Sequence, residues 1–139
     1  MTQPTEVTGP IEAVIYAATD GQDTDFTAKL VAVAPDGRAI NVCDGIIRAR
    51  YRNTLSQAEL LEPGQVYEYC IQLGSTSFVF PPGHCIRLEV SSSNFPRFDR
   101  NLNTGGEFGV EAAGRPAVQR VFHGGIRASH VVLPVIPQA

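Results

Sequence analysis

The stretch VYEYCIQL, which runs from Val66 to Leu73, indicates the fold most clearly. Its residues alternate in character: Val66, Glu68, Cys70 and Gln72 lie on one side of an extended chain, and Tyr67, Tyr69, Ile71 and Leu73 on the other. A period of two residues is typical of a β-strand with one buried face. We therefore expect a strand whose aromatic and aliphatic set points into the core.

Similar strand patterns occur on both sides of this stretch. Turn sequences such as Pro35-Asp36-Gly37 and Pro81-Pro82-Gly83 separate them. The further predicted strands are Pro10–Ala18, Asp25–Ala34, Arg38–Tyr51, Phe78–Phe80, His84–Ser91, Ala117–Phe122 and Ser129–Ile136. Asp44-Gly45, in the middle of one of them, predicts a bulge or a sharp bend.

One short helical turn is predicted over Ser56–Leu61, with Ser56 as the N-cap and Glu59 as its capping-box partner. About eight strands with almost no helix predict an all-β fold, an antiparallel two-sheet sandwich or jelly roll. The length of 139 residues suits one domain. We therefore expect residues 1–139 to form a single β-sandwich domain.

A long loop is predicted over Ser92–Pro116, which is rich in Ser, Asn, Gly and Pro and has no sustained period. Structureless segments of this length inside a domain are often functional or packed against a partner. Aromatic residues and arginines are enriched in protein interfaces. The candidate interface residues of this loop are Phe95, Arg97, Phe98, Arg100 and Phe108.

Composition argues against several classes of partner. The net charge is −3 and the 11 basic residues are scattered, whereas phosphate backbones require clustered Lys and Arg. The longest apolar stretches are too short for a membrane span, and no export signal is recognised. We expect no nucleic-acid or membrane partner. Three widely spaced cysteines, Cys43, Cys70 and Cys85, are expected to be reduced core residues, which favours a cytoplasmic location.

No catalytic residue is predicted. A serine hydrolase needs Gly-x-Ser-x-Gly on a strand-to-helix turn, and Leu73-Gly74-Ser75-Thr76-Ser77 lacks the second glycine. The three histidines, His84, His123 and His130, are not expected to form one site. A Cys–His pair stays open on spacing alone, although strand residue Cys85 has no helix N-terminus to activate it.

No metal or cofactor is predicted either. Asp20, Asp23 and Asp25 have a spacing that calcium can use, but turn and capping roles are favoured because the full calcium-loop motif is absent. No glycine-rich loop opens a helix to cradle a phosphate. The arginines of one predicted strand face, Arg48, Arg50 and Arg52, suit an acidic partner, but an ordinary solvated face laced with ion pairs is favoured.

Several blocks of sequence resemble a known family along nearly the whole chain. They include DTDFTAKL at Asp23–Leu30, PDGRAIN at Pro35–Asn41, DGIIRARYR at Asp44–Arg52, SSSNFPRFDRN at Ser91–Asn101 and the final Leu133-Pro134-Val135. These blocks are similar to the C-terminal domain of the cocaine-esterase and X-Pro dipeptidyl-peptidase family of serine hydrolases.

The resemblance implies a jelly-roll sandwich like that of galactose-binding domains, placed after an α/β-hydrolase domain and a helical cap. In that family the catalytic residues lie in the hydrolase domain, so none carries over to this chain. The leading hypothesis is a non-catalytic domain that packs on and stabilises such a hydrolase domain, in cis or in trans. The alternatives are a stand-alone carbohydrate-binding module and a hydrolase in its own right. Self-association through exposed apolar surface also stays open.

Overall fold

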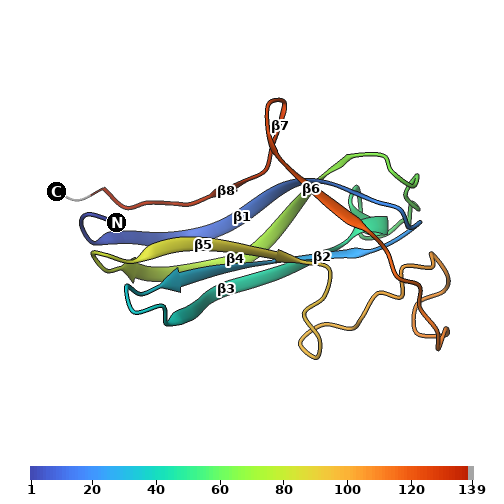
Figure 1. Ribbon diagram of the computed structural model, residues 1–139, viewed down its shortest axis with the longest axis horizontal. Helices are drawn as coiled ribbons and strands as arrows, with labels where there is room; N and C mark the ends of the chain where they lie inside the picture. The colour runs from blue at the N-terminus through green and yellow to red at the C-terminus, as the bar shows by residue number, and fades with distance from the viewer. Residues whose placement is uncertain (138–139) are drawn as a thin grey trace.

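Strand β1 (Thr5–Thr19) forms the centre of the larger of two antiparallel sheets. Strand β4 (Tyr67–Phe80) pairs with one edge of β1, and β6 (Gln119–Gly124) and β8 (His130–Val132) pair one after the other with the opposite edge. Strand β7 (Arg127–Ala128) pairs with β6. The computed structural model, which describes residues 1–137, appears in Figure 1.

The smaller sheet has the order β3 (Ala39–Arg48), β2 (Asp25–Val33) and β5 (Cys85–Ser91). It packs against the larger sheet, so the predicted all-β two-sheet sandwich is confirmed, with eight strands among the described residues. The alternation of the opening stretch is also confirmed, because Tyr69, Ile71 and Leu73 are buried while Glu68, Cys70 and Gln72 are exposed.

Inward-facing residues of β1, β2 and β4 fill the core between the sheets. These residues are Val7, Ile11, Ala13, Ile15 and Ala17 of β1, Phe26, Ala28, Leu30 and Ala32 of β2, and Tyr69, Ile71, Leu73 and Phe80 of β4. Alanines alternate with larger side chains on β1 and β2, so the two sheets can interdigitate at normal packing density. These three strands therefore supply most of the buried apolar side chains of the core.

Two irregularities differ from the predicted strand pattern. The bulge in β3 falls at Val42, because Leu30 pairs with Cys43 while Val31 pairs with Asn41. Gly45 has another role: a Cβ placed there would overlap the carbonyl oxygen of Gln72 on β4 and lie 2.9 Å from its carbonyl carbon. The predicted bulge or bend at Asp44-Gly45 is therefore a bulge two residues earlier and a close contact between the sheets.

The predicted strands over Val66–Leu73 and Phe78–Phe80 are a single strand. Strand β4 continues through Gly74, whose φ of 85° accommodates a register shift against β1. Strand β3 ends at Arg48, three residues before its predicted end, and a short 3-10 helix, η1 (Ala49–Tyr51), follows.

The predicted helical turn over Ser56–Leu61 is wrong, since these residues form turns and extended loop. The backbone N–H of Glu59 donates to the carbonyl of Arg50, and that of Leu61 to the carbonyl of Gln22, both at 2.8 Å. Contacts with distant parts of the chain thus replace the local hydrogen bonds that a helix would need.

The prediction that the cysteines are core residues is wrong for two of the three. All three are free, Cys43 is half-buried, and Cys70 and Cys85 are exposed. Their positions in the alternation place both exposed thiols on the outer faces of the sheets. No helix among residues 1–137 is long and apolar enough to cross a membrane.

Candidate functional site

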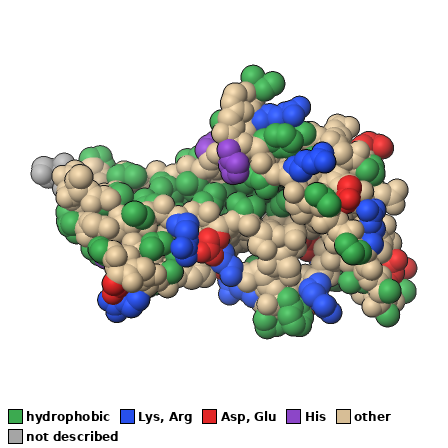
Figure 2. All heavy atoms as spheres, viewed as in Figure 1, with side chains coloured by type: hydrophobic (Ala, Val, Ile, Leu, Met, Phe, Trp, Pro, Cys, Tyr) green, Lys and Arg blue, Asp and Glu red, His purple; other side chains and the backbone are tan. Residues whose placement is uncertain are grey.

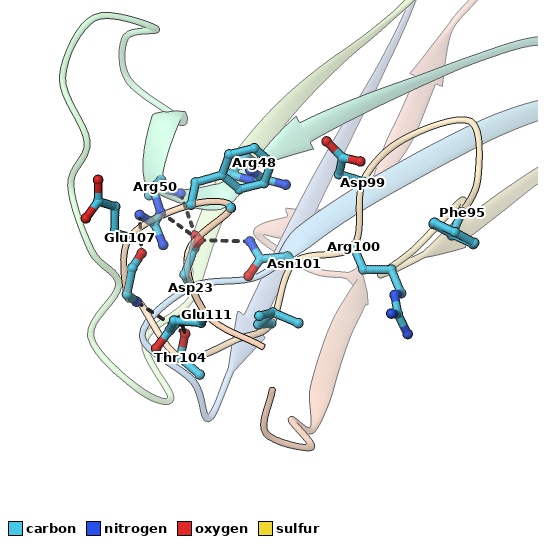
Figure 3. Close-up of a pocket in the computed structure, with 14 residues that line it drawn as sticks. Asp23, Arg48, Arg50, Phe95, Asp99, Arg100, Asn101, Thr104, Glu107 and Glu111 are labelled. Atoms are coloured by element: carbon cyan, nitrogen blue, oxygen red, sulfur yellow. Dashed lines mark hydrogen bonds and ion pairs between the residues drawn. The ribbon is translucent and has the colours of Figure 1, made fainter. Parts of the chain in front are cut away.

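A cleft of about 320 Å³ lies at one end of the sandwich, where the long loop between β5 and β6 folds back over the start of β2 and the end of β3 (Figure 3). The predicted loop over Ser92–Pro116 is confirmed, because no strand or helix is assigned between Ser91 and Gln119. The cleft is bordered by loop residues from Phe95 to Glu111 and by Asp23, Arg48 and Arg50. We call it the loop-end cleft.

Two buried carboxylates organise the floor of the loop-end cleft. Asp25 accepts two hydrogen bonds of 2.9 Å from Nε and Nη2 of Arg48. Asp23 accepts hydrogen bonds from Nε and the backbone N–H of Arg50, at 2.7 and 3.1 Å. The side-chain amide of Asn101 donates to both carboxylates at 2.8 Å. The loop is therefore tied to the sandwich through Asn101.

The charges of this floor are paired within the chain. Asp23 and Asp25 are almost completely buried, and both arginines are largely covered. The hydrogen bonds and charge of Asp25 raise the pKa of Arg48 despite its burial. Arg50 also donates from Nη1 to the carbonyl of Gly106 at 3.0 Å, which holds a second point of the loop. The arrangement positions the loop rather than leaving a free charge for a reaction.

The predicted solvated face of Arg48, Arg50 and Arg52 is therefore wrong. Arg48 and Arg50 form ion pairs with buried aspartates, and Arg52 donates to the carbonyls of Ala49 and Glu59. Two of the three aspartates whose spacing suggested calcium, Asp23 and Asp25, are the partners of these arginines. The paired residues are 23 and 27 positions apart, so local sequence patterns could not predict the pairs. The one sequence signal that included all four residues was the family resemblance, whose blocks Asp23–Leu30 and Asp44–Arg52 contain them.

The five candidate interface residues lie around the outer part of the loop. Phe95 and Phe108 are 62% and 54% exposed, and Phe98 is half-buried. Each ring has an arginine over it: Arg100 over Phe95 at 5.4 Å, Arg97 over Phe98 at 5.5 Å and Arg48 over Phe108 at 4.1 Å. Figure 3 shows Phe95 and Arg100 standing away from the Asp23 and Asn101 cluster.

Asp44 on β3 holds the first part of this loop. Its carboxylate forms an ion pair with Arg97, with 3.0 Å between Nε and Oδ2, and accepts a hydrogen bond of 3.0 Å from the side-chain amide of Asn94. Of the five predicted residues, three line the loop-end cleft, namely Phe95, Arg100 and Phe108, whereas Arg97 and Phe98 pair with each other outside its lining. These residues form a surface of cationic and aromatic side chains on an anchored scaffold.

The loop-end cleft carries none of the histidines or cysteines of the chain along its walls. Ser75, the serine of the incomplete nucleophile motif, lies in β4 and is exposed. Among residues 1–137, no group of three His, Cys, Asp or Glu side chains is arranged to hold a metal ion.

Comparison with known proteins places the chain among parts of larger enzymes. A profile of the family described as "X-Pro dipeptidyl-peptidase C-terminal non-catalytic domain" matches residues 1–132. The chain is 52% identical over 138 residues to the cocaine esterase of Rhodococcus sp. (strain MB1 Bresler), covering 98% of this chain and 24% of that enzyme. It is 27% identical over 150 residues to a putative serine esterase of Mycobacterium bovis, covering 96% of this chain and 22% of that protein.

Solved structures agree with these sequence matches. An α-amino acid ester hydrolase superimposes with a TM-score of 0.91 at 30% identity, over 98% of this chain and 24% of that one. An aminopeptidase from a marine sediment Thaumarchaeota archaeon gives 0.87 at 32% identity, over 99% and 24%. The chain thus spans about a quarter of the length of the relatives it matches, and it belongs to the family of X-Pro dipeptidyl-peptidase C-terminal non-catalytic domains.

Proposed function

We propose that this chain packs on, and stabilises, the α/β-hydrolase catalytic domain of a serine esterase or peptidase. The observation that carries the proposal is coverage: nearly all of this chain corresponds to only about a quarter of enzymes named as an esterase, an ester hydrolase and an aminopeptidase. Because the family is described as non-catalytic, the proposed role of this β-sandwich is to support the remaining three quarters of such an enzyme.

The contact surface of this proposal is the anchored loop with Phe95, Arg97, Phe98, Arg100 and Phe108. Exposed aromatic rings supply apolar area, and the arginines stacked over them supply donors for carboxylates or carbonyls of a partner. The hydrogen bonds of Asn101 and Asp44 hold the loop before binding. A preorganised loop loses less conformational entropy when it binds.

Carbohydrate binding has less support from the same surface. A sugar ring needs an open aromatic face, and the guanidinium of Arg48 covers one face of Phe108 at 4.1 Å. The amide of Asn101 is used by Asp23 and Asp25. Binding to a glycan array would restore this alternative.

The three free cysteines support a reducing environment, for which we propose the cytoplasm. Two of these thiols, Cys70 and Cys85, are exposed, and exposed thiols persist where the surroundings keep them reduced. Localisation of a tagged enzyme in its host tests this proposal, and recovery from an oxidising compartment would contradict it.

Association in solution tests the proposed function. The probe is the Rhodococcus cocaine esterase lacking the quarter that matches this chain, mixed with the purified chain and followed by sedimentation velocity. We expect a one-to-one complex with Kd below about 10 μM. Two components that sediment independently at concentrations on the order of 100 μM would contradict the proposal.

A further inference from the structure

The two sheets of the sandwich approach each other most closely on one side. There β3 lies against β4, and the backbone of Gly45 contacts that of Gln72. On the opposite side the smaller sheet ends in β5, and the larger sheet ends in β8 and, farther along, in β6 with β7. Within residues 1–137, β5 pairs only with β2, and β8 pairs only with β1, so neither outer edge has a further strand.

Apolar side chains from both sheets meet at this second side. They are Ile86, Leu88 and Val90 of β5, Val121 of β6, Val131 of β8, and Leu133 directly after β8. All six pack against the core and all six remain half-buried. We call this strip the open seam. Figure 2 shows hydrophobic side chains gathered along the middle of this face, where Figure 1 places β1, β5 and β8.

The N-terminus of the domain is fixed at one end of the open seam. The amino group of Met1 donates to the carbonyl of His84 at 2.8 Å, and the N–H of Gly83 donates to the carbonyl of Met1 at 2.9 Å. These residues directly precede Cys85, the first residue of β5. A polypeptide joined to Met1 in a longer enzyme would therefore reach the domain at the head of β5.

The other end of the open seam leads to the proposed contact loop. Strand β5 ends at Ser91, and the loop with Phe95 and Phe98 begins at the next residue. One strand edge thus runs from the point where the rest of the enzyme joins to the surface on which we propose that it docks. A partner that spans these two points passes along the half-buried apolar strip between them.

We propose that the open seam is a second docking face, covered by an aliphatic or aromatic segment of the polypeptide that precedes this domain in the full-length enzyme. This inference rests on the proposed function and adds a separate surface to it. All six residues that line the seam are uncharged hydrocarbon side chains, so the occupant is apolar. Covering them also shields two unpaired strand edges, which otherwise favour association with other chains.

Hydrogen exchange tests the open seam directly. The sample is a chimaeric esterase in which this chain replaces the matching quarter of the Rhodococcus cocaine esterase, compared with the chain alone. We expect peptides that cover β5 and β8 to exchange about ten-fold more slowly in the chimaera, a change of about 1.4 kcal/mol. Peptides that cover β4, the opposite edge of the larger sheet, serve as the control because β4 lines neither the seam nor the loop-end cleft, and they should exchange at similar rates in both samples.

The outcomes separate the two proposals. Protection of the 92–116 loop without protection of β5 and β8 would overturn the open seam and leave the proposed function standing. Equal slowing of β4 and β5 would indicate global stabilisation and would also overturn the seam. Protection at neither surface would overturn both proposals.

If the chimaera does not fold, a binding measurement with variants of the chain tests the seam instead. Leu88→Gln in the seam and Val79→Gln on β4, where Val79 is 50% exposed, are each mixed with the truncated esterase. After circular dichroism has confirmed that both variants fold, we expect Leu88→Gln to raise Kd about ten-fold and Val79→Gln to leave it unchanged. Equal affinities for the two variants would overturn the seam.

Discussion

Arg48 holds the carboxylate of Asp25 through two parallel hydrogen bonds of 2.9 Å, from Nε and Nη2. The pair joins the end of β3 to the start of β2, and the Asp25 side chain is 1% exposed. Asn101 extends the same network into the long loop. The stability of the sandwich end and the position of the proposed contact surface therefore depend on one ion-pair network.

Replacing Arg48 by Ala is expected to destabilise the chain strongly. The substitution leaves the buried Asp25 carboxylate without its bidentate partner, and breaking such a pair costs about 3 kcal/mol or more. Urea denaturation followed by circular dichroism measures the free energy of unfolding. Arg38→Ala is the matched control, because the Arg38–Asp36 pair is exposed and should contribute less than about 1 kcal/mol. Equal losses in the two variants would refute the structural role of Arg48.

Gly45→Ala tests the contact between the two sheets. The added methyl group would meet the backbone of Gln72, which cannot rotate away as a side chain can, so β3 and β4 would have to separate. We expect a loss of about 3 kcal/mol in the free energy of unfolding, or failure to fold. Gly124→Ala has open space around the new Cβ and should change stability by less than about 1 kcal/mol. A Gly45→Ala variant as stable as the parent would show that the sheets do not touch there.

Tyr69→Phe is expected to stabilise the chain, in contrast to most core substitutions. The Tyr69 hydroxyl is buried and has no hydrogen-bond partner among the described residues. An unsatisfied buried polar group costs about 1 to 3 kcal/mol, so its removal should raise the free energy of unfolding by about 1 kcal/mol at pH 7. Thermal and urea unfolding at pH 7 measure the change, and a loss of stability would reveal a partner for the hydroxyl.

The same variant has a pH dependence. Burial raises the pKa of Tyr69 in the folded chain, so the unfolded chain loses this proton at lower pH than the folded chain does. Below about pH 10, the ordinary tyrosine pKa, Tyr69 is protonated in both the folded and the unfolded chain, so its ionisation does not affect stability. Above that pH the unfolded chain ionises first, and the free energy of unfolding falls as pH rises further. We expect stability to fall less steeply between about pH 10 and pH 11 in Tyr69→Phe than in the parent. Parallel pH profiles would contradict this assignment.

Phe95→Ser and Phe108→Ser test the contact loop. Both rings are more than half exposed, so neither substitution should alter the unfolding of the chain by more than about 1 kcal/mol. Each should weaken binding to the truncated Rhodococcus esterase about ten-fold or more in titration calorimetry. Leu55→Ser is the control, because Leu55 is 90% exposed on a different loop and should leave Kd unchanged. Loss of affinity in all three variants would contradict a specific surface.

Local alternation predicted the faces of the strands well. It placed Tyr69 inward and Cys70 outward on β4, and both positions are confirmed. The general burial preference of cysteine, applied to Cys70 and Cys85, predicted the wrong environment, although the alternation around each thiol already pointed outward. Backbone geometry fixes the direction of a strand side chain, and the preference of a residue type for the core does not override it.

Long-range partners explain what the sequence did not predict. The capping-box pattern at Ser56 and Glu59 is local, but the carboxylate of Glu59 binds Asn53 and its N–H binds the carbonyl of Arg50. The partners of Arg48 and Arg50 are likewise distant in sequence. Hydrogen bonds and ion pairs of this kind depend on the completed topology. Periodicity therefore predicted the sandwich, but the residues that form the floor of the loop-end cleft could be identified only from the structure.

The most direct test of the account compares three forms of the Rhodococcus cocaine esterase: the intact enzyme, the enzyme without its matched quarter, and the chimaera that carries this chain in place of that quarter. The measurement is the half-life of esterase activity at a temperature where the intact enzyme slowly inactivates. A non-catalytic stabilising domain predicts that truncation shortens the half-life at least about ten-fold and that the chimaera recovers most of it. A truncated enzyme as durable as the intact one, or a chimaera no more durable than the truncated form, would contradict the central claim.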